Sequence, residues 1–232
     1  MSTAPVATLS ATDASLGFAE QLRQSCWEDW NACIQHRFVD EIFDGSLSDD
    51  VLRRYLVQDY QFINRFVALL GAAIASADVF APRVTLSQFA AMITSDENTY
   101  FLRSFDVLGV PPADRLQPAL TAPTQAFQQL MHEAAQSLNY ANCMAVLAVA
   151  EGIYLDWADQ DAKKSLPMPQ RFEHSEWIVL HANDFFRGFV GWLRSELDRI
   201  GPTLSEVQKA EATSYFQRAV KLERQFFDHV YE

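Results

Sequence analysis

The sequence has few cysteines and few basic residues. Its three cysteines, Cys26, Cys33 and Cys143, are an odd number without the spacing of a metal site. Cys26 and Cys33 lie seven residues apart on one expected helix, about 10 Å along its axis, so they cannot bridge each other locally. The chain has 18 Lys and Arg against 30 Asp and Glu, a formal net charge of −12. This balance argues against nucleic acid and anionic membranes as partners and favours a small neutral or cationic ligand.

Targeting and membrane-spanning segments are also missing. No uncharged apolar run reaches the roughly 18 to 20 residues of a membrane span. The first residues have neither the basic n-region nor the apolar h-region of a signal peptide. With the free cysteines, these absences predict a cytoplasmic protein. Residues 1–14 are expected to form a flexible leader, and residues 15–232 a single domain without internal repeats.

No stretch has the alternating β-branched residues that are typical of strands, whereas apolar residues recur at helical spacing along the whole chain. The pattern predicts an all-α domain of about seven or eight helices. Residues 162–170 contain two prolines and are expected to form a mobile rim or lid. Thr203 and Glu206 match a capping box at the start of the last helix. Helices are expected over residues 16–42, 48–77, 82–108, 123–138, 139–159, 171–200 and from 203 to the C-terminus.

Three expected helices each carry one acid within an apolar face. Glu151 lies in the middle of residues 139–159, the most apolar helix, and Asp59 and Glu223 repeat the pattern elsewhere. An unpaired carboxylate in such surroundings costs several kcal/mol, so each acid must be paired, hydrogen-bonded or held neutral. The same-face neighbours are Met144, Leu147, Ala148, Tyr154, Leu155 and Ala158 for Glu151; Leu52, Tyr55, Leu56, Phe62, Ile63 and Phe66 for Asp59; and Phe216, Ala219, Val220, Phe226, Phe227 and Val230 for Glu223.

Two interpretations of these acids are open. Each could pair with an arginine such as Arg65 or Arg218 and brace the helices. Alternatively, the three acids could meet in one pocket with aromatic walls, a common way for a helical bundle to bind and act on a polar heterocycle. The threefold repetition favours the pocket. Cys143 is interpreted as a small buried hydrophobe rather than a nucleophile.

The histidines do not indicate a metal site. Carboxylate-rich bundles that hold two iron ions carry Glu-x-x-His on two helices, and this motif is absent. His132 and His174 are expected to be exposed, whereas His181 lies in the apolar run WIVLH and is expected to face inward. We therefore predict neither a metal nor another cofactor.

Two segments carry a family resemblance. Residues 36–47, followed by residues 55–60, resemble the opening pattern of the TenA family, the thiaminase II group of the heme-oxygenase-like helical fold. Residues 222–227 resemble the family's last-helix signature. The resemblance extends over essentially the whole chain after the leader.

This resemblance implies a hydrolase of thiamin salvage that cleaves a C–N bond at the methyl carbon of an aminopyrimidine, giving hydroxymethylpyrimidine. By resemblance, Asp59 would hold the amino and ring nitrogens, and Glu223 would protonate the leaving amine. A homodimer or homotetramer is expected, because oligomers are usual in the family. The residues that would surround the ring are Phe38, Phe66, Tyr154 and Phe226.

The sequence departs from the branch of the family that uses a cysteine nucleophile. Ala150 stands where that thiol is expected, four residues before Tyr154. Glu151, together with His181 and Asn183, is more similar to the cysteine-less branch, which is associated with amino- and formylamino-pyrimidines, and Glu151 would position or deprotonate water. Positions that are tyrosines in the cysteine branch read Phe62, Phe66, Phe127 and His181.

Two alternatives to this enzyme were left open by the sequence. One is a binding or regulatory protein that keeps the pocket without the chemistry, although the acidic charge argues against direct DNA binding. The other is an oxygenase-like or cofactor-biosynthesis relative of the same fold, which would need a metal or a quinone precursor.

Overall fold

A computed structural model describes residues 16–232, so the leader predicted for residues 1–14 lies outside the described part. Within residues 16–232 every regular element is helical, which confirms the all-α prediction. The elements are α1 (Phe18–Gln24), α2 (Trp27–Ile34), α3 (Arg37–Asp44), α4 (Asp49–Tyr60), α5 (Phe62–Ser76), α6 (Phe80–Met92), the π-helical turn η2 (Ile93–Glu97), α7 (Asn98–Val107), α8 (Pro112–Leu116), α9 (Ala122–Ser137), α10 (Tyr140–Ala158), α11 (Asp161–Lys164), α12 (Phe172–His181), α13 (Asp184–Ile200), the 3-10 turn η3 (Gly201–Thr203) and α14 (Glu206–His229).

Several helices that the sequence predicts as continuous are broken. Residues 16–42 form three helices, and residues 48–77 are interrupted at Gln61, whose side-chain amide donates to the carbonyl of Arg115 at 3.0 Å. Residues 171–200 break before Asn183, which caps α13 by accepting from the amide of Phe186 at 2.9 Å. Successive segments keep their apolar faces toward the same core, so periodicity alone did not reveal these one- or two-residue breaks.

The start of the last helix differs from the prediction by two residues. Thr203 belongs to η3, and the N-cap of α14 is Ser205. The Ser205 hydroxyl accepts from the amide of Gln208 at 3.3 Å, and the Gln208 side chain accepts from the amide of Ser205 at 3.0 Å. This reciprocal pair is a capping box. The expected pair of Thr203 and Glu206 was therefore wrong, because Ser205 and Gln208 offer the same pattern two residues later.

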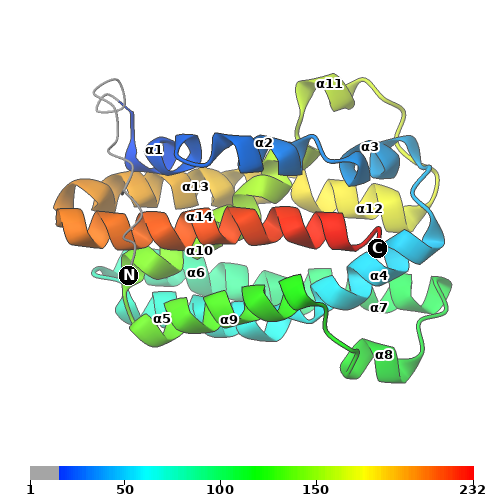
Figure 1. Cartoon of the computed structure of the whole chain (residues 1–232), viewed down its shortest axis with the longest axis horizontal. Coiled ribbons are helices and arrows are strands. Elements are labelled where there is room, and N and C mark those ends of the chain that lie inside the picture. Colours follow the sequence, from blue (N-terminus) through cyan, green and yellow to red (C-terminus); the bar gives the residue numbers. More distant parts are fainter. Residues whose placement is uncertain (1–15) are drawn as a thin grey trace, which may run out of the picture.

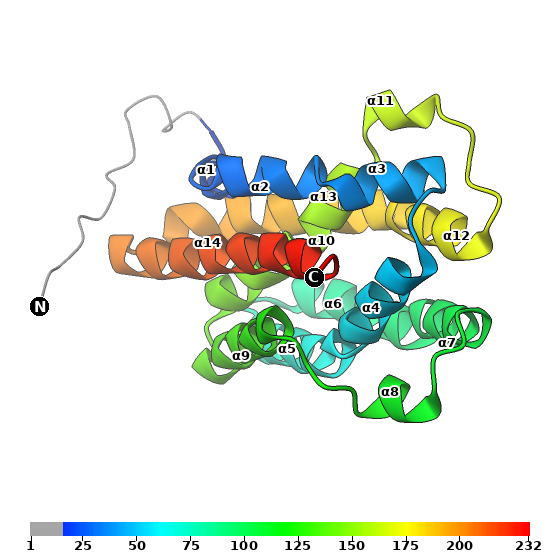
Figure 2. The same ribbon diagram turned by 45° about the vertical axis from the view of Figure 1, so that its right-hand side comes forward.

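Helix α10 forms the centre of the bundle. It packs most extensively on α14, α13 and α5, and also contacts α2, α9 and α12. In Figures 1 and 2, α1, α2 and α3 follow one side of the molecule and α5 and α9 the other, while α14 runs between them in front of α10. Every residue of α10 except Ala150 and Asp156 is buried, which confirms that this is the most buried helix.

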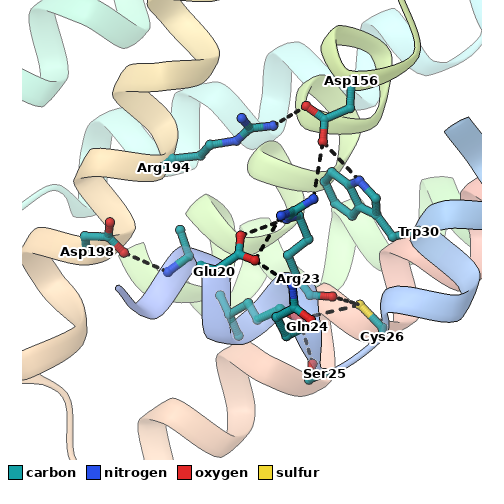
Figure 3. A network of polar contacts seen from close by, with 11 residues as sticks. Glu20, Arg23, Gln24, Ser25, Cys26, Trp30, Asp156, Arg194 and Asp198 are labelled. Atoms are coloured by element: carbon teal, nitrogen blue, oxygen red, sulfur yellow. Dashed lines mark hydrogen bonds and ion pairs between the residues drawn. The ribbon is translucent and has the colours of Figure 1, made fainter. Parts of the chain in front are cut away.

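A polar cluster fixes the second half of α10 against three other helices (Figure 3). The carboxylate of Asp156 accepts from the indole Nε1–H of Trp30 at 3.1 Å and from Arg194 on α13 at 2.6 Å. Arg23 on α1 lies 4.0 Å from the same carboxylate and also pairs with Glu20 at 2.8 Å. These contacts set the rotation of α10 about its axis and therefore the direction of the side chains on its opposite face.

Gly152 allows α2 to pack closely on α10. A Cβ atom at Gly152 would lie 2.9 Å from the indole ring of Trp30, which is closer than real Cβ contacts allow. Because Trp30 is also hydrogen-bonded to Asp156, its ring has little freedom to move aside. Gly152 thus allows the contact that holds the neighbouring Glu151 in place.

Candidate active site

A pocket lies between α4, α5, η2, α9, α10, α12 and α14. Its walls are mainly aromatic and aliphatic, and four carboxyl groups face it. The lining residues are Asp59, Phe62, Ile63, Phe66, Ile93, Glu97, Phe127, Met131, Ala150, Glu151, Tyr154, Trp177, His181 and Glu223.

The structure brings together the three acids that the sequence singled out. Asp59 comes from α4, Glu151 from α10 and Glu223 from α14, and all three line the pocket. The side chains of Glu151 and Glu223 are buried, with 9% and 3% of the residue exposed. Asp59 is half-buried. The apolar same-face neighbours read from the sequence are the reason that these acids point into the core.

A fourth acid, Glu97, was not predicted. It ends the π-helical turn η2, in which one extra residue shifts the backbone hydrogen bonds from i→i+4 to i→i+5. In sequence, Glu97 belongs to a polar run that is typical of an exposed helix face. Periodicity therefore gave no signal for it, because the π turn changes which face each following side chain occupies.

The four pocket acids have no basic partner among the described residues. Arg218, which the sequence offered as a partner, pairs instead with Glu133 at 2.6 Å. Arg65 forms no ion pair with any of the four. The interpretation of these acids as paired braces was therefore wrong, and each carboxyl group has to be accommodated in another way.

Burial raises the pKa of all four carboxyl groups because the charged form is poorly solvated. The pKa of Glu97 is raised to about 7 by burial alone. The pKa values of Asp59 and Glu151 are raised well above the usual range, first by burial and then by the nearby Glu97. That of Glu223 is raised by burial and by Asp59. The pocket therefore holds a mixture of neutral and ionised carboxyl groups near neutral pH, and it favours a cationic ligand.

A pair of tyrosines orients Asp59. The Tyr55 hydroxyl donates to the Tyr154 hydroxyl at 2.8 Å, which in turn donates to Oδ1 of Asp59 at 3.5 Å. Burial, followed by the charge of Asp59, raises the pKa of both tyrosines, so both remain neutral donors. The sequence predicted Tyr154 as part of the wall but missed the role of Tyr55, since a hydroxyl at the end of a buried ring has no signature of its own.

His181 is held as a neutral acceptor. Its Nδ1–H donates to the backbone carbonyl of Trp177 at 2.8 Å, which leaves Nε2 as the unprotonated nitrogen. Burial lowers the pKa of His181 to about 4. The imidazole faces the pocket, as expected from the sequence, and can accept a hydrogen bond from an amino group.

The predicted aromatic walls divide into two layers. Phe62, Phe66 and Phe127 line the pocket, and the rings of Phe62 and Phe127 lie 5.4 Å apart, edge to face. Phe38 and Phe226 do not line it, contrary to the expectation. Phe226 packs behind Phe62, with 5.2 Å between ring centroids, and Phe38 packs on Tyr55 at 4.4 Å. These two residues support the wall from behind, because helical periodicity identifies a buried face but not its depth.

Two polar predictions are corrected by the structure. Asn183 lies outside this pocket at the start of α13, where its side chain satisfies the first backbone amides of the helix. His174 is fully buried rather than exposed, and neither ring nitrogen has a hydrogen-bond partner within the described residues. It lies between polar neighbours in sequence, but α12 packs on both α3 and α7 and turns this position inward. His132 is half-buried.

No thiol lines the pocket in the described part of the chain. Ala150, which the sequence resemblance places at the nucleophile position of the cysteine branch, lines the pocket. The buried Cys143 lies elsewhere on α10, and its Sγ–H donates to the carbonyl of Ala134 at 3.3 Å. Burial raises its pKa to about 12, so it remains a thiol at neutral pH.

The described residues contain no group of three or more His, Cys, Asp and Glu side chains placed to hold a metal ion. The four acids line the walls of the pocket without converging on a single point. Within the described residues, no helix is both long enough and apolar enough to cross a membrane.

Comparison with known proteins identifies the family. Residues 23–232 match the TENA/THI-4/PQQC family, and the chain belongs to it. An aminopyrimidine aminohydrolase of Halalkalibacterium halodurans is 25% identical over 221 residues, which covers 93% of this chain and 96% of that protein.

Solved structures agree on the fold. A TenA homologue from Pyrococcus furiosus superposes with a TM-score of 0.79 at 21% identity, covering 92% of this chain and all of the other. A domain of unknown function from Shewanella denitrificans, described as having a heme oxygenase-like fold, has a TM-score of 0.63 at 14% identity and covers 91% of both chains. The protein thus has the heme-oxygenase-like fold that the sequence predicted.

Proposed function

We propose that this protein is a hydrolase that removes the amine or formylamine from the methyl carbon of an aminopyrimidine, yielding hydroxymethylpyrimidine, without a cysteine nucleophile. The observation that carries this proposal is a single aromatic pocket with four unpaired carboxyl groups and an alanine at the thiol position. The name of the relative from Halalkalibacterium halodurans, aminopyrimidine aminohydrolase, supports it.

Asp59 is the residue we assign to the pyrimidine. A carboxyl group matches the adjacent amino group and ring nitrogen of an aminopyrimidine, as two parallel hydrogen bonds. Tyr154 fixes the direction of this carboxyl group through its hydroxyl. The rings of Phe62, Phe66 and Phe127 provide the flat apolar surfaces against which a heterocycle packs.

Glu223 and Glu151 act as acid and base in the substitution at one carbon, Glu223 on the leaving nitrogen and Glu151 on the attacking water. Glu223 ensures that the nitrogen leaves with a proton as the C–N bond breaks: it hydrogen-bonds to an amine that arrives protonated, and it donates its own proton to the neutral nitrogen of a formylamine. Glu151 accepts a proton from a water molecule, whose oxygen forms the new C–O bond. A bound pyrimidine that shares a positive charge with Asp59 favours the ionised form of a neighbouring carboxyl group, so Glu151 can act as the base while Glu223 remains protonated.

The test of this proposal follows product formation from three candidate substrates. The purified protein is incubated with thiamin, aminomethyl-aminopyrimidine and its N-formyl derivative, and hydroxymethylpyrimidine is quantified. We expect product from the two aminopyrimidines and little from thiamin. Glu206→Gln changes an exposed glutamate at the start of α14 and is the matched control for the variant Glu223→Gln, which removes a carboxyl group of the pocket. Absence of product from all three, with the compounds still raising the Tm, would instead indicate a binding protein.

A further inference from the structure

A second pocket adjoins the candidate active site on its outer side. It lies between α6, η2 and the turn that joins α12 to α13. Two residues, Glu97 and His181, line both pockets and therefore form the wall between them. The other residues of this outer pocket are Gln88, Met92, Leu180, Asn183, Phe185 and Phe186.

The two pockets meet at this shared wall, and its two residues are both polar. Phe185 is half exposed at 52%, so the outer pocket reaches the surface. Glu97 is half-buried, whereas Glu151 and Glu223 are buried behind it. A molecule that enters from the outer pocket meets Glu97 before it meets the acids of the proposed reaction.

The charge of Glu97 acts on the acids behind it. Among neighbouring charges, Glu97 makes the largest contribution to the raised pKa of both Asp59 and Glu151. No Lys or Arg lines either pocket in the described part of the chain. His181 is neutral, so no protein cation at this wall balances Glu97. A cationic ligand group would relieve this repulsion, whereas a neutral one would not.

We infer that Glu97 is a specificity-determining residue at the mouth of the active site, which favours substrates whose leaving nitrogen is a protonated amine over those with a neutral formylamine. This inference rests on the proposed function. The two substrates share the pyrimidine and the carbon attacked, and they differ at the nitrogen. Asp59, Glu151 and Glu223 act on both substrates in the proposed reaction. Glu97 distinguishes the two substrates by the charge on the leaving nitrogen.

The experiment compares kcat/KM for aminomethyl-aminopyrimidine and its N-formyl derivative in the wild type and in Glu97→Gln. We expect the amine-to-formylamine ratio to fall at least about tenfold, chiefly through a higher KM for the amine, with the formyl derivative changed less than about threefold. Glu97→Asp keeps the charge and should retain most of the ratio. Parallel losses for both substrates, or an unchanged ratio, would overturn the inference.

Two further measurements separate the inference from the proposed function. Circular dichroism and Tm show whether Glu97→Gln folds, and if it does not, the comparison is made with Glu97→Ala, which also removes the charge; Leu180→Trp, which fills the outer pocket, is the control. Leu180→Trp should slow both substrates equally. If the wild type hydrolyses neither compound, the proposed function fails, and calorimetric Kd values still test Glu97. Tighter binding of the amine than of the formyl derivative, lost in Glu97→Gln, would support the inference, and equal binding would overturn it.

Discussion

Helix α10 carries two acids, five residues apart, in opposite surroundings. Asp156 accepts hydrogen bonds from Trp30 and Arg194, and the cluster in Figure 3 uses it to join α10 to its neighbours. Glu151 faces the pocket, where no described residue hydrogen-bonds or pairs with it, and where burial and the nearby Glu97 raise its pKa. We therefore expect Asp156 to stabilise the bundle and Glu151 to destabilise it.

This difference is consistent with the role in chemistry that we propose for Glu151. Arginines are available around α10, since Arg194 and Arg187 on α13 pair with Asp156 and Asp159. None is directed to Glu151. A carboxyl group kept unpaired at an energetic cost, within a pocket, is characteristic of a functional site rather than of a structural one. The four predictions below test this contrast.

The largest effect is expected from Glu223→Gln. The amide cannot donate a proton to the neutral leaving nitrogen of the formylamine, so kcat for that substrate should fall by about 10² to 10⁴, the usual contribution of general acid catalysis. The Tm should stay equal or rise, because a buried repelling acid is removed. Turnover within a factor of three of the wild type would show that Glu223 is not the acid.

Glu151→Gln should have a smaller effect on rate. Because the amide can still hold water but cannot accept its proton, we expect kcat to fall roughly 10- to 100-fold. The Tm at pH 7 should rise by a few degrees, as about 1 kcal/mol corresponds to roughly 2–4 °C in a chain of this size. Differential scanning calorimetry measures this change. A lower Tm would mean that Glu151 stabilises the fold, like its neighbour Asp156.

Asp156→Ala should have the opposite effects: it should lower the stability and leave the turnover nearly unchanged. It leaves the buried indole Nε1–H of Trp30 without its acceptor and frees Arg194, so we expect a loss of about 1–3 kcal/mol in the free energy of unfolding. Chemical denaturation measures the loss, and kcat at 25 °C should remain within about threefold of the wild type. A large loss of turnover in a folded variant would show that this cluster contributes to the chemistry directly.

The smallest effect concerns pH. The folded protein keeps protons on the pocket acids that the unfolded chain releases above about pH 4.5, so their contribution to stability falls as the pH rises. Between pH 7 and 8, above the unfolded pKa of histidine, the Tm of the wild type should fall more than that of the double variant Glu151→Gln and Glu223→Gln. The Tm of Asp156→Ala serves as the control and should change with pH as the wild type does. Identical slopes for wild type and double variant would show that the two acids are ionised in the folded state.

Much of this site was predictable because it is built on regular helices. Asp59, Glu151 and Glu223 interrupt apolar faces with a period of 3.6 residues, and the helices place all three in one pocket. Phe62 and Phe127 followed from the same periodicity. Depth within the core did not, so Phe38 and Phe226 were assigned to the wall although they pack behind it.

The remaining parts depend on local backbone geometry that a periodic pattern does not contain. The breaks at Gln61 and before Asn183 are set by individual side-chain hydrogen bonds. Glu97 enters the pocket because of the π turn, and the inward position of His174 results from packing of α12 on two other helices. The break at Gln61 and the position of His174 also depend on neighbours that are distant in sequence.

The π turn has a consequence for how substrate preference can evolve. An insertion of a single residue into an α-helix produces such a turn, and the flanking helices α6 and α7 need not move. Deletion of one residue within the turn would restore a regular helix while α7 stays in place, and it would change the side chains of the turn itself, which include Glu97. Family members can thus gain or lose this carboxyl group through a change in length, with every acid of the inner pocket left in place.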